Sequence, residues 1–176
     1  KEALIVDERW NGGGFIPDFF VERLARRTVA YWSTREGDDF RSPQSAIDGP
    51  KCMLINHYAG SGGDALPHYF RLEGLGPLIG TRTWGGLVGI SRDLPLMDGG
   101  VVTIPDFGMW SPRDGKWEIE NHGVDPDIEV EFLPEDGVAG RDPQLDKAIE
   151  WINAELAKNP YRKPPRPAYK TQEGLK

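Results

Sequence analysis

Ser61 is the residue whose type and setting most directly predict chemistry in this sequence. It stands in the stretch Ala59-Gly60-Ser61-Gly62-Gly63, after an apolar run at 52–55 and before a segment with helical spacing. A serine at the turn between a buried strand and a helix can act as a nucleophile, because the free N–H groups of the first helical turn can hold an oxyanion beside it. The alternative is a serine that caps the helix. On this stretch alone capping is favoured, because capping serines are common.

A second glycine loop, Asn11-Gly12-Gly13-Gly14, also follows an apolar run and precedes a segment with helical spacing. If the two runs are neighbouring parallel strands, both loops lie at the same edge of the sheet, where the sites of α/β proteins form. One glycine N–H from each loop could then hold an oxyanion. Two alternatives are a flexible turn and a phosphate site. The phosphate site is disfavoured because the loop lacks the lysine and Ser/Thr of a phosphate-binding loop.

A serine nucleophile needs a base, and the sequence offers three histidines. His57 lies in the approach to the turn, and His68 falls in the helix that follows it. His122 comes much later, and the order Ser61, an aspartate and His122 would match the chain order of an α/β-hydrolase. Each histidine alone is more often a packing or surface residue than a catalyst, so these patterns leave the base open.

The segments around these residues predict an α/β protein. Apolar runs typical of buried strands occur at 3–6, 52–56 and 78–79, and helical spacing occurs at 16–24, 64–72 and 143–158. Strands that alternate with helices favour a mostly parallel sheet flanked by helices. Short β-rich runs with turn signals between 87 and 132 predict an added β-rich lobe, and a short hairpin is expected within 31–41.

Composition limits the class of protein. The chain has 176 residues, of which 38% are hydrophobic and 28% charged, and its net charge is -7. An acidic chain of this kind is a poor nucleic-acid partner, and no apolar run approaches the ~20 residues that span a bilayer. Its single cysteine excludes an internal disulfide and fits a cytoplasmic, reducing compartment. We find no metal-ligand cluster and no cofactor motif, so we expect neither a metal nor a cofactor.

The organisation along the chain predicts one domain and a tail. Residues 1–158 hold the expected strands and helices, whereas residues 159–176 are rich in Pro and Lys and are expected to be extended or disordered. The chain opens on Lys1 within a strand-like stretch, which we interpret as a piece of a longer protein.

Four segments, in order, resemble the catalytic domain shared by tail-specific (C-terminal processing) peptidases and tricorn proteases. LIVDERWNGGG is similar to the strand and loop that supply one oxyanion donor, GSGGD to the nucleophile turn, LIGTRTWGG to the segment after the nucleophile helix, and PRDGKWEIENHGVDPDIEV to the closing hairpin and turn. The likeness covers about residues 3–131. It implies a Clp-protease/crotonase-like α/β fold and a serine peptidase.

The two branches of this group differ in their base. Tail-specific peptidases place a lysine after the nucleophile helix, but Gly86 stands at the matching position here. Arg82 cannot replace that lysine, because its pKa is too high for it to accept a proton. Tricorn proteases take a histidine from a region before an intervening PDZ domain and orient it partly through a glutamate, which matches Glu120. The resemblance therefore implies that the base lies upstream of Lys1 and that this chain alone is nearly or wholly inactive.

The resemblance also implies roles for individual residues. Ser61 would attack the scissile carbonyl, and Gly62 would hold the oxyanion together with Gly14 or Gly13. Peptide substrate would lie along Trp84, Gly89 and Ile90. The expected partners are extended peptides, upstream domains of the same polypeptide that include a PDZ-like domain, and further copies in a homo-oligomer.

Other classes of function remain open beside the tricorn-type interpretation. An α/β-hydrolase-like esterase would use Ser61 with His122. A crotonase-like enzyme would use the same two-donor oxyanion hole for acyl-CoA chemistry and would need no serine nucleophile. A non-catalytic module would bind extended peptides without turnover.

Overall fold

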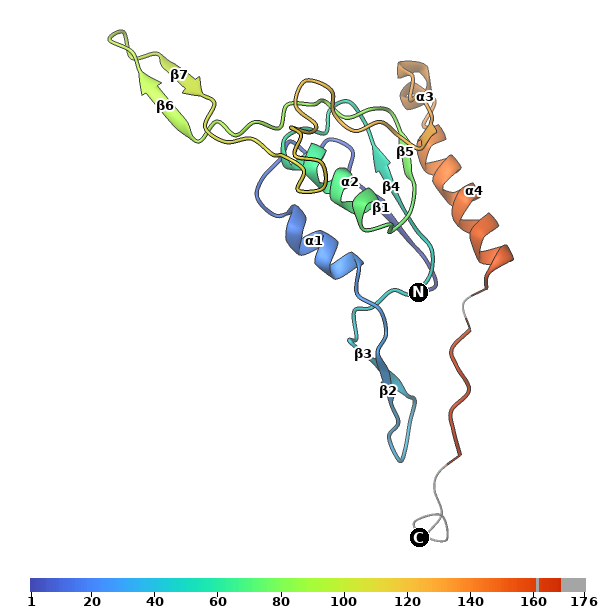
Figure 1. Cartoon of the computed structure of the whole chain (residues 1–176). Coiled ribbons are helices and arrows are strands. Elements are labelled where there is room, and N and C mark those ends of the chain that lie inside the picture. Colours follow the sequence, from blue (N-terminus) through green and yellow to red (C-terminus); the bar gives the residue numbers. More distant parts are fainter. Residues whose placement is uncertain (161, 169–176) are drawn as a thin grey trace, which may run out of the picture.

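Four parallel strands form the central sheet of the computed structural model, which describes residues 1–160 and 162–168 (Figure 1). Their order is β1-β4-β5-β8, with bounds Leu4–Asp7, Lys51–Ile55, Leu78–Gly80 and Ile128–Glu129. In the register, Asp7 of β1 lies beside Leu54 of β4, so these neighbouring strands end together. The loops that follow β1 and β4 therefore leave the sheet at one edge.

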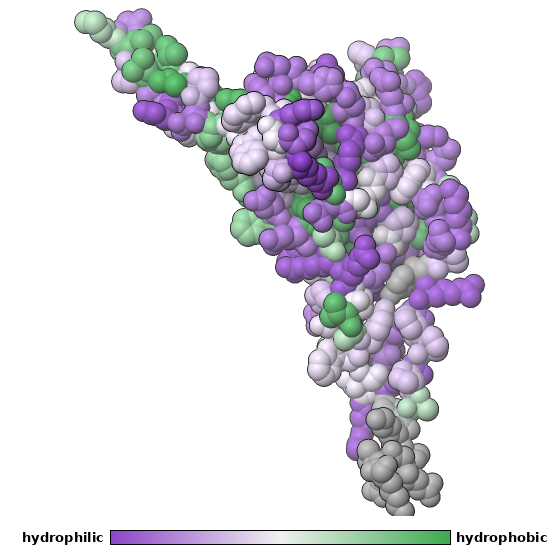
Figure 2. Space-filling view, in the orientation of Figure 1, coloured by the Kyte–Doolittle hydropathy of each residue, from purple (hydrophilic) through white to green (hydrophobic). Residues whose placement is uncertain are grey.

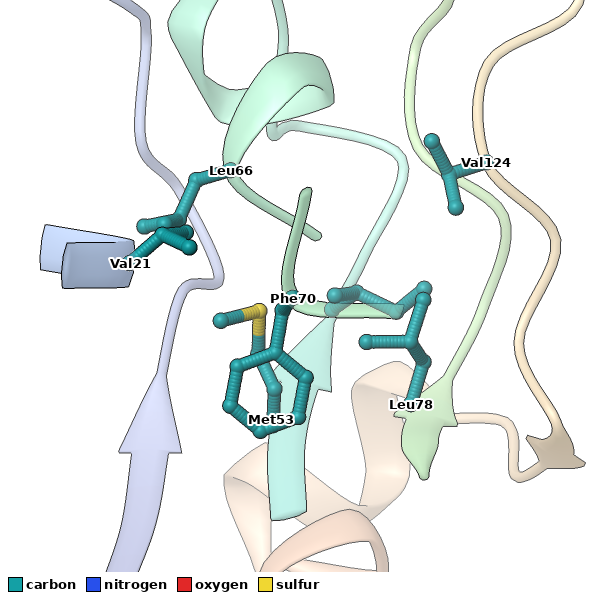
Figure 3. Close-up of a cluster of buried hydrophobic side chains, with 7 residues drawn as sticks. Val21, Met53, Leu66, Phe70, Leu78 and Val124 are labelled. Carbon is teal, nitrogen blue, oxygen red and sulfur yellow. The ribbon is translucent and has the colours of Figure 1, made fainter. Parts of the chain in front are cut away.

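Helices α1 (Pro17–Leu24) and α2 (Gly62–Leu72) pack on one face of this sheet. Their contact with the sheet is the larger apolar cluster, drawn in Figure 3, where Val21 of α1 lies beside Leu66 of α2 and Phe70 lies beside Met53 of β4. Phe70 and Met53 are fully buried. Burial of an aromatic side chain removes a large apolar area from water, so this cluster fixes α2 and the turn before it on the sheet.

Helix α4 (Pro143–Lys158) covers the opposite face, where Ala148 and Ile152 pack against Cys52 and Leu54. Successive residues of β4 thus point to opposite faces, as the pleat of a strand requires. All five residues of β4 are buried, which explains its uninterrupted apolar run. Burial also raises the pKa of the Cys52 thiol to about 12, so this cysteine is a packing residue.

Two antiparallel hairpins extend from the sheet and helices (Figure 1). The first pairs β2 (Ala30–Trp32) with β3 (Phe40–Ser42), and the second pairs β6 (Arg92–Pro95) with β7 (Val101–Ile104). Figure 2 shows hydrophobic residues over the β6–β7 arm, and its exposed apolar side chains are Leu94, Leu96, Met97, Val101 and Val102. A short helix, α3 (Pro134–Val138), precedes α4.

The predicted α/β architecture is confirmed, with each expected strand and helix present within a few residues of its predicted bounds. The expected hairpin is β2–β3, and the β-rich region contributes β6, β7 and the sheet strand β8. Asp142 caps α4 by accepting a hydrogen bond from the Leu145 N–H at 2.9 Å. In the described part of the chain, every helix is too short or too polar to span a bilayer.

The expected tail is described only at 159–160 and 162–168; residue 161 and residues 169–176 lie outside the described residues. Residues 162–168 contain no helix or strand. They contact the β2–β3 hairpin, where Lys163 Nζ lies 2.7 Å from a carboxylate oxygen of Asp39. The division into a domain and a tail stays a prediction.

Candidate active site

Ser61 occupies the turn between β4 and α2 in a strained conformation. Its φ is 56° and its ψ is -116°, a left-handed backbone that non-glycine residues rarely adopt. The Ser61 N–H donates to the Gly86 carbonyl at 3.0 Å, and its carbonyl accepts from the N–H groups of Asp64 and Ala65. The Ser61 side chain makes no capping hydrogen bond to α2. The geometry thus argues against the capping alternative and leaves the hydroxyl available.

The two glycine loops pack backbone against backbone. A Cβ added to Gly13 would lie 2.7 Å from the Ser61 Cβ, and one added to Gly62 would lie 2.3 Å from the Gly14 carbonyl oxygen. Gly13 and Gly14 also have φ values of 118° and 121°, which side chains disfavour. Both loops need glycine here because no side chain fits between them. The structure therefore brings together the four residues predicted around the oxyanion.

Two N–H groups are available at this contact. Among the described residues, no hydrogen-bond acceptor pairs with the N–H of Gly62 or of Gly14. The N–H of Gly13 instead donates to the Asn11 Oδ1 at 3.0 Å. The geometry thus favours Gly14 over Gly13 as the donor from this loop.

Ser61, Gly62 and Gly14 line a cavity of about 470 Å³. Its walls are mainly apolar and are formed by Phe15, Ala65, Tyr69, Leu87, Ile90, Phe107 and Met109. Burial, with the charge of Asp18 adding to it, raises the pKa of Tyr69, so this phenol stays protonated. Such a cavity suits apolar side chains next to a polar reacting group.

Gly89 and Ile90, which were predicted to bind substrate, line the same cavity as Ser61. The backbone of Gly89 is already paired, since its N–H donates to Phe107 and its carbonyl accepts from Asp106, both at 2.8 Å. Neighbouring residues of an extended strand point their polar groups to opposite sides. The free edge for a further strand is therefore offered by Ile90.

Trp84 lies outside the set of residues that line the Ser61 cavity. Its ring covers Gly60 and Gly86, where an added Cβ would lie 2.5 Å and 2.3 Å from ring carbons. The Trp84 N–H donates to the Ala59 carbonyl at 2.8 Å. Trp84 therefore packs on the glycines of the Ser61 turn and of the following segment, and it does not line the cavity.

Glu120 holds the segment that forms one wall of the cavity. Its Oε2 accepts hydrogen bonds from the N–H groups of Leu87 and Val88 at 2.8 Å and 2.7 Å. Among the described residues, no donor pairs with its Oε1. Glu120 lines a second cavity of about 440 Å³, which shares Leu87, Phe107, Gly108 and Met109 with the first cavity. Ser61 and Glu120 thus face adjoining cavities.

Asp64 is a site residue that the sequence patterns did not single out. It is fully buried in the first turn of α2, and its Oδ1 accepts a hydrogen bond from the Gly85 N–H at 2.8 Å. Together with the bond from Ser61 to Gly86, this contact ties the segment after β5 to the turn that holds Ser61. Within the described residues, the other carboxylate oxygen of Asp64 has no partner. The available signal was an acidic residue in the first helical turn, directly after the glycines that follow Ser61.

The sequence model of Peptidase family S41 matches residues 1–130 of this chain. The chain belongs to peptidase family S41. The tricorn protease of Thermoplasma acidophilum is 44% identical over 95% of this chain, and tricorn protease homolog 1 of Streptomyces coelicolor is 44% identical over 94%. A crystal structure of the tricorn protease superposes on 89% of the chain with a TM-score of 0.82. The predicted resemblance is thereby confirmed.

This S41 chain spans only a small part of its relatives. It covers 16% of the Thermoplasma protein, 15% of the Streptomyces protein and 15% of the tricorn chain in the crystal structure. The predicted site residues Ser61 and Glu120 both fall inside the part that the family model matches.

None of the three histidines of this S41 chain lines the Ser61 cavity, and each has a partner elsewhere. The His57 ring lies against that of Tyr58 at a tilt of 41°, with ring centroids 3.9 Å apart, and lines a different cavity. His68 contacts Glu118 at 3.0 Å, and burial lowers its pKa, which favours the neutral ring. His122 contacts Asp125 at 2.7 Å with 64% of its side chain exposed.

The titratable side chains that line the Ser61 cavity, among the described residues, are those of Asp18 and Tyr69. Among the described residues, neither a histidine nor a lysine lines it. The surface position of His122 argues against an α/β-hydrolase arrangement. The described residues also contain no group of three or more His, Cys, Asp or Glu side chains placed to hold a metal ion.

Proposed function

We propose that this chain carries the nucleophile of a serine peptidase whose base is supplied from outside residues 1–176. The observation that carries the proposal is the junction of the two glycine loops. There Ser61 has a strained backbone and its hydroxyl makes no capping bond to α2. The N–H groups of Gly62 and Gly14, which no described residue pairs with, lie in the same cavity. A structural turn would have no need of the strain or of the unpaired donors. Membership of peptidase family S41 supports this function.

In the proposed reaction, the Ser61 Oγ attacks the scissile carbonyl carbon while its proton passes to the base. The carbonyl oxygen becomes an oxyanion and receives hydrogen bonds from the N–H groups of Gly62 and Gly14. Collapse of this intermediate breaks the C–N bond, and the amine leaves with the proton from the base. Water then attacks the acyl-enzyme in the same way and releases the acid, which restores Ser61.

Because no described histidine or lysine lines the cavity, we place the base elsewhere in the complete protein. In this proposal a histidine from an upstream region enters between the two adjoining cavities. Glu120 keeps its loop contacts through Oε2 and uses Oε1 to orient that group and stabilise its protonated form. The PDZ-like domain and the homo-oligomer stay predictions for the part of the protein beyond this chain.

An extended peptide is the proposed substrate. Phe107 pairs with the inner edge of the segment at Ile90, and no described residue pairs with the outer edge, so a peptide can add there as a further strand beside Ser61. The aromatic and aliphatic walls of the cavity would receive apolar side chains of that peptide.

The nucleophile is tested by Ser61→Ala in the complete protein. We expect kcat for a fluorogenic peptide to fall by several orders of magnitude while peptide binding changes little, because nucleophile loss in such enzymes costs up to about a million-fold. Ser91→Ala is the matched control, since Ser91 lines the same cavity and bonds to Asp106. The role of Ser61 is excluded if Ser61→Ala keeps more than a few per cent of activity. It is also excluded if a fluorophosphonate labels Ser61 of the wild-type protein no faster than Ser91.

The role of Glu120 is tested by Glu120→Gln in the complete protein. The glutamine oxygen can still accept from Leu87 and Val88, whereas its amide no longer offers an anion at the other position. We expect kcat to fall about 10²- to 10⁴-fold with the fold retained. Glu118→Gln, which changes a nearby carboxylate bound to His68, is the control. An unchanged kcat would reduce Glu120 to a structural residue.

The source of the base is tested with this chain alone and with the rest of the protein added in trans. We expect almost no turnover by the chain alone, because a serine hydroxyl is a weak nucleophile without a base. Activity that appears on addition supports an external base. Peptide binding without turnover in both cases would favour the non-catalytic binding module.

A further inference from the structure

A buried glutamate lies directly behind the glycine loop. Glu8 follows β1 and is only 5% exposed. Its backbone continues the sheet, because its N–H donates to the Leu54 carbonyl at 3.0 Å. Its carboxylate Oε1 accepts a hydrogen bond from the Asn11 Nδ2 at 2.7 Å. A carboxylate so well buried is uncommon unless it has a partner, and here the partner belongs to the glycine loop.

Asn11 connects Glu8 to both glycine loops through hydrogen bonds. Its side-chain Oδ1 accepts from the Gly13 N–H at 3.0 Å, and its backbone carbonyl accepts from the Gly60 N–H at 3.0 Å. The carboxylate only accepts and the Gly13 N–H only donates, so Asn11 satisfies both in one amide orientation alone. Glu8 thereby determines which way the Asn11 side chain faces.

These hydrogen bonds decide which N–H group of the loop stays unpaired. The Gly13 N–H is held by Asn11, so the next N–H, that of Gly14, is the one left open in the Ser61 cavity. The loop cannot shift toward the nucleophile turn, since the Gly13 and Ser61 backbones are already in close contact. A loosened Asn11 would let the loop rotate in the other direction and move the Gly14 N–H.

We propose that Glu8 is a positioning residue, which fixes the oxyanion loop through Asn11 so that the Gly14 N–H stays directed at the Ser61 site. The catalytic consequence rests on the proposed peptidase function, whereas the loop network does not. Protonation of Glu8 weakens the bond to Asn11, because a charged acceptor binds a donor more strongly than a neutral one. The position of the loop is therefore coupled to pH.

The burial of Glu8 and the charges around it set the pH range over which this coupling acts. Burial raises the pKa of Glu8 to about 7, the bond from Asn11 opposes that rise, and the charge of Asp7 adds to it. Next in the chain, Arg9 is held by Asp7 and Asp142. The segments packed on the loop carry further ionisable groups, namely His57 and Tyr58 on the turn after β4 and Asp64 on α2. His57 is a histidine on a segment packed against the loop, so it needs its own control.

The test follows the backbone amides of this chain by NMR from about pH 5 to pH 9. We expect the Gly13 amide shift to titrate with a midpoint near 7, because the Gly13 N–H bonds to the residue that Glu8 orients. The titration should persist in His57→Gln and vanish in Glu8→Gln, which keeps an acceptor for Asn11 but no titrating proton. A flat Gly13 shift in the wild type, or a titration that vanishes in His57→Gln, overturns the proposal.

Hydrogen exchange gives a second measurement on the same chain. Glu8→Leu removes the acceptor, and we expect the Gly13 amide to exchange roughly tenfold faster, as for the loss of one hydrogen bond. Amides of β4 serve as an internal reference for global unfolding. If Gly13 exchange changes only in proportion to that reference, Glu8 acts on overall stability and its positioning role is refuted.

Kinetics of the complete protein connect the loop to catalysis. We expect Glu8→Leu to lower kcat at least about tenfold with a smaller change in KM, because an oxyanion donor acts in the transition state. Glu2→Leu, an exposed glutamate before β1, is the matched control. A kcat loss no larger than in that control contradicts the positioning role. A wild-type protein without turnover, but with the amide response intact, would count against the peptidase function and leave the loop network supported.

Discussion

Replacing Glu8 by glutamine should stabilise the folded chain at neutral and alkaline pH. The folded-state pKa of Glu8 is raised from 4.5 to about 7, chiefly by burial. Between these two values the folded state binds the Glu8 proton and the unfolded chain releases it. Stability contributed by this group is therefore fully present below about pH 4.5 and is lost as the pH rises through 7. Glutamine carries no charge and escapes this loss.

The magnitude follows from the size of the shift. A rise from 4.5 to about 7 corresponds to about 3 kcal/mol, at about 1.4 kcal/mol for each pKa unit. The quantity to compare is the free energy of unfolding of Glu8→Gln minus that of wild type. We expect this difference to be larger at about pH 8 than at about pH 4 by about 3 kcal/mol. Urea denaturation at several pH values measures the difference, provided that the m-values agree.

The comparison with wild type removes the titration of every other group. Glu73→Gln is the control, because it makes the same chemical change at an exposed position at the end of α2. The reasoning is refuted if the stability difference between Glu8→Gln and wild type is the same at about pH 4 and pH 8. The buried carboxyl would then not titrate between those values in the folded chain.

Two further substitutions test the packing of the site and of the core. Gly62→Ala should destabilise the chain by more than about 1 kcal/mol and abolish activity of the complete protein, because its Cβ would lie 2.3 Å from the Gly14 carbonyl oxygen. Gly12→Ala, where nothing lies within 4 Å of an added Cβ, should be close to neutral in urea denaturation, and equal effects of the two would contradict this account. Phe70→Ala should cost about 3–5 kcal/mol, since Phe70 is fully buried. Phe19→Ala, at a side chain 71% exposed, should cost far less, and a Phe70 loss as small would exclude tight packing there.

The secondary structure and fold class could be predicted from the sequence because they depend on local patterns. The buried run of β4 and the spacing of α2 were visible as hydrophobic periodicity, and the Asp142-Pro143 start of α4 as cap chemistry. The parallel order of β1 and β4 followed from their alternation with helices. The meeting of the two glycine loops at one sheet edge was a consequence of that order.

Other features of the site could not be predicted, because they depend on contacts between distant segments. Two of these features depend on how loops fold against one another: the hydrogen bond from the Gly13 N–H to Asn11, and the packing of Trp84 on the Ser61 turn. The same holds for Asp64, whose partner Gly85 lies in another segment. Sequence patterns cannot assign such hydrogen-bond partners, since each group has many possible partners within reach.

By itself, the sequence determined the strand and helix pattern and where the nucleophile serine candidate sits in it, because both depend on residue type and short-range spacing. Only the tertiary structure decided which oxygen of Glu120 is occupied, which glycine keeps a free N–H, and that no described histidine or lysine lines the Ser61 cavity. Those properties arise because segments distant in the chain pack together, and this packing fixes which donors pair with which acceptors. Their geometry is set by packing, which local patterns do not encode.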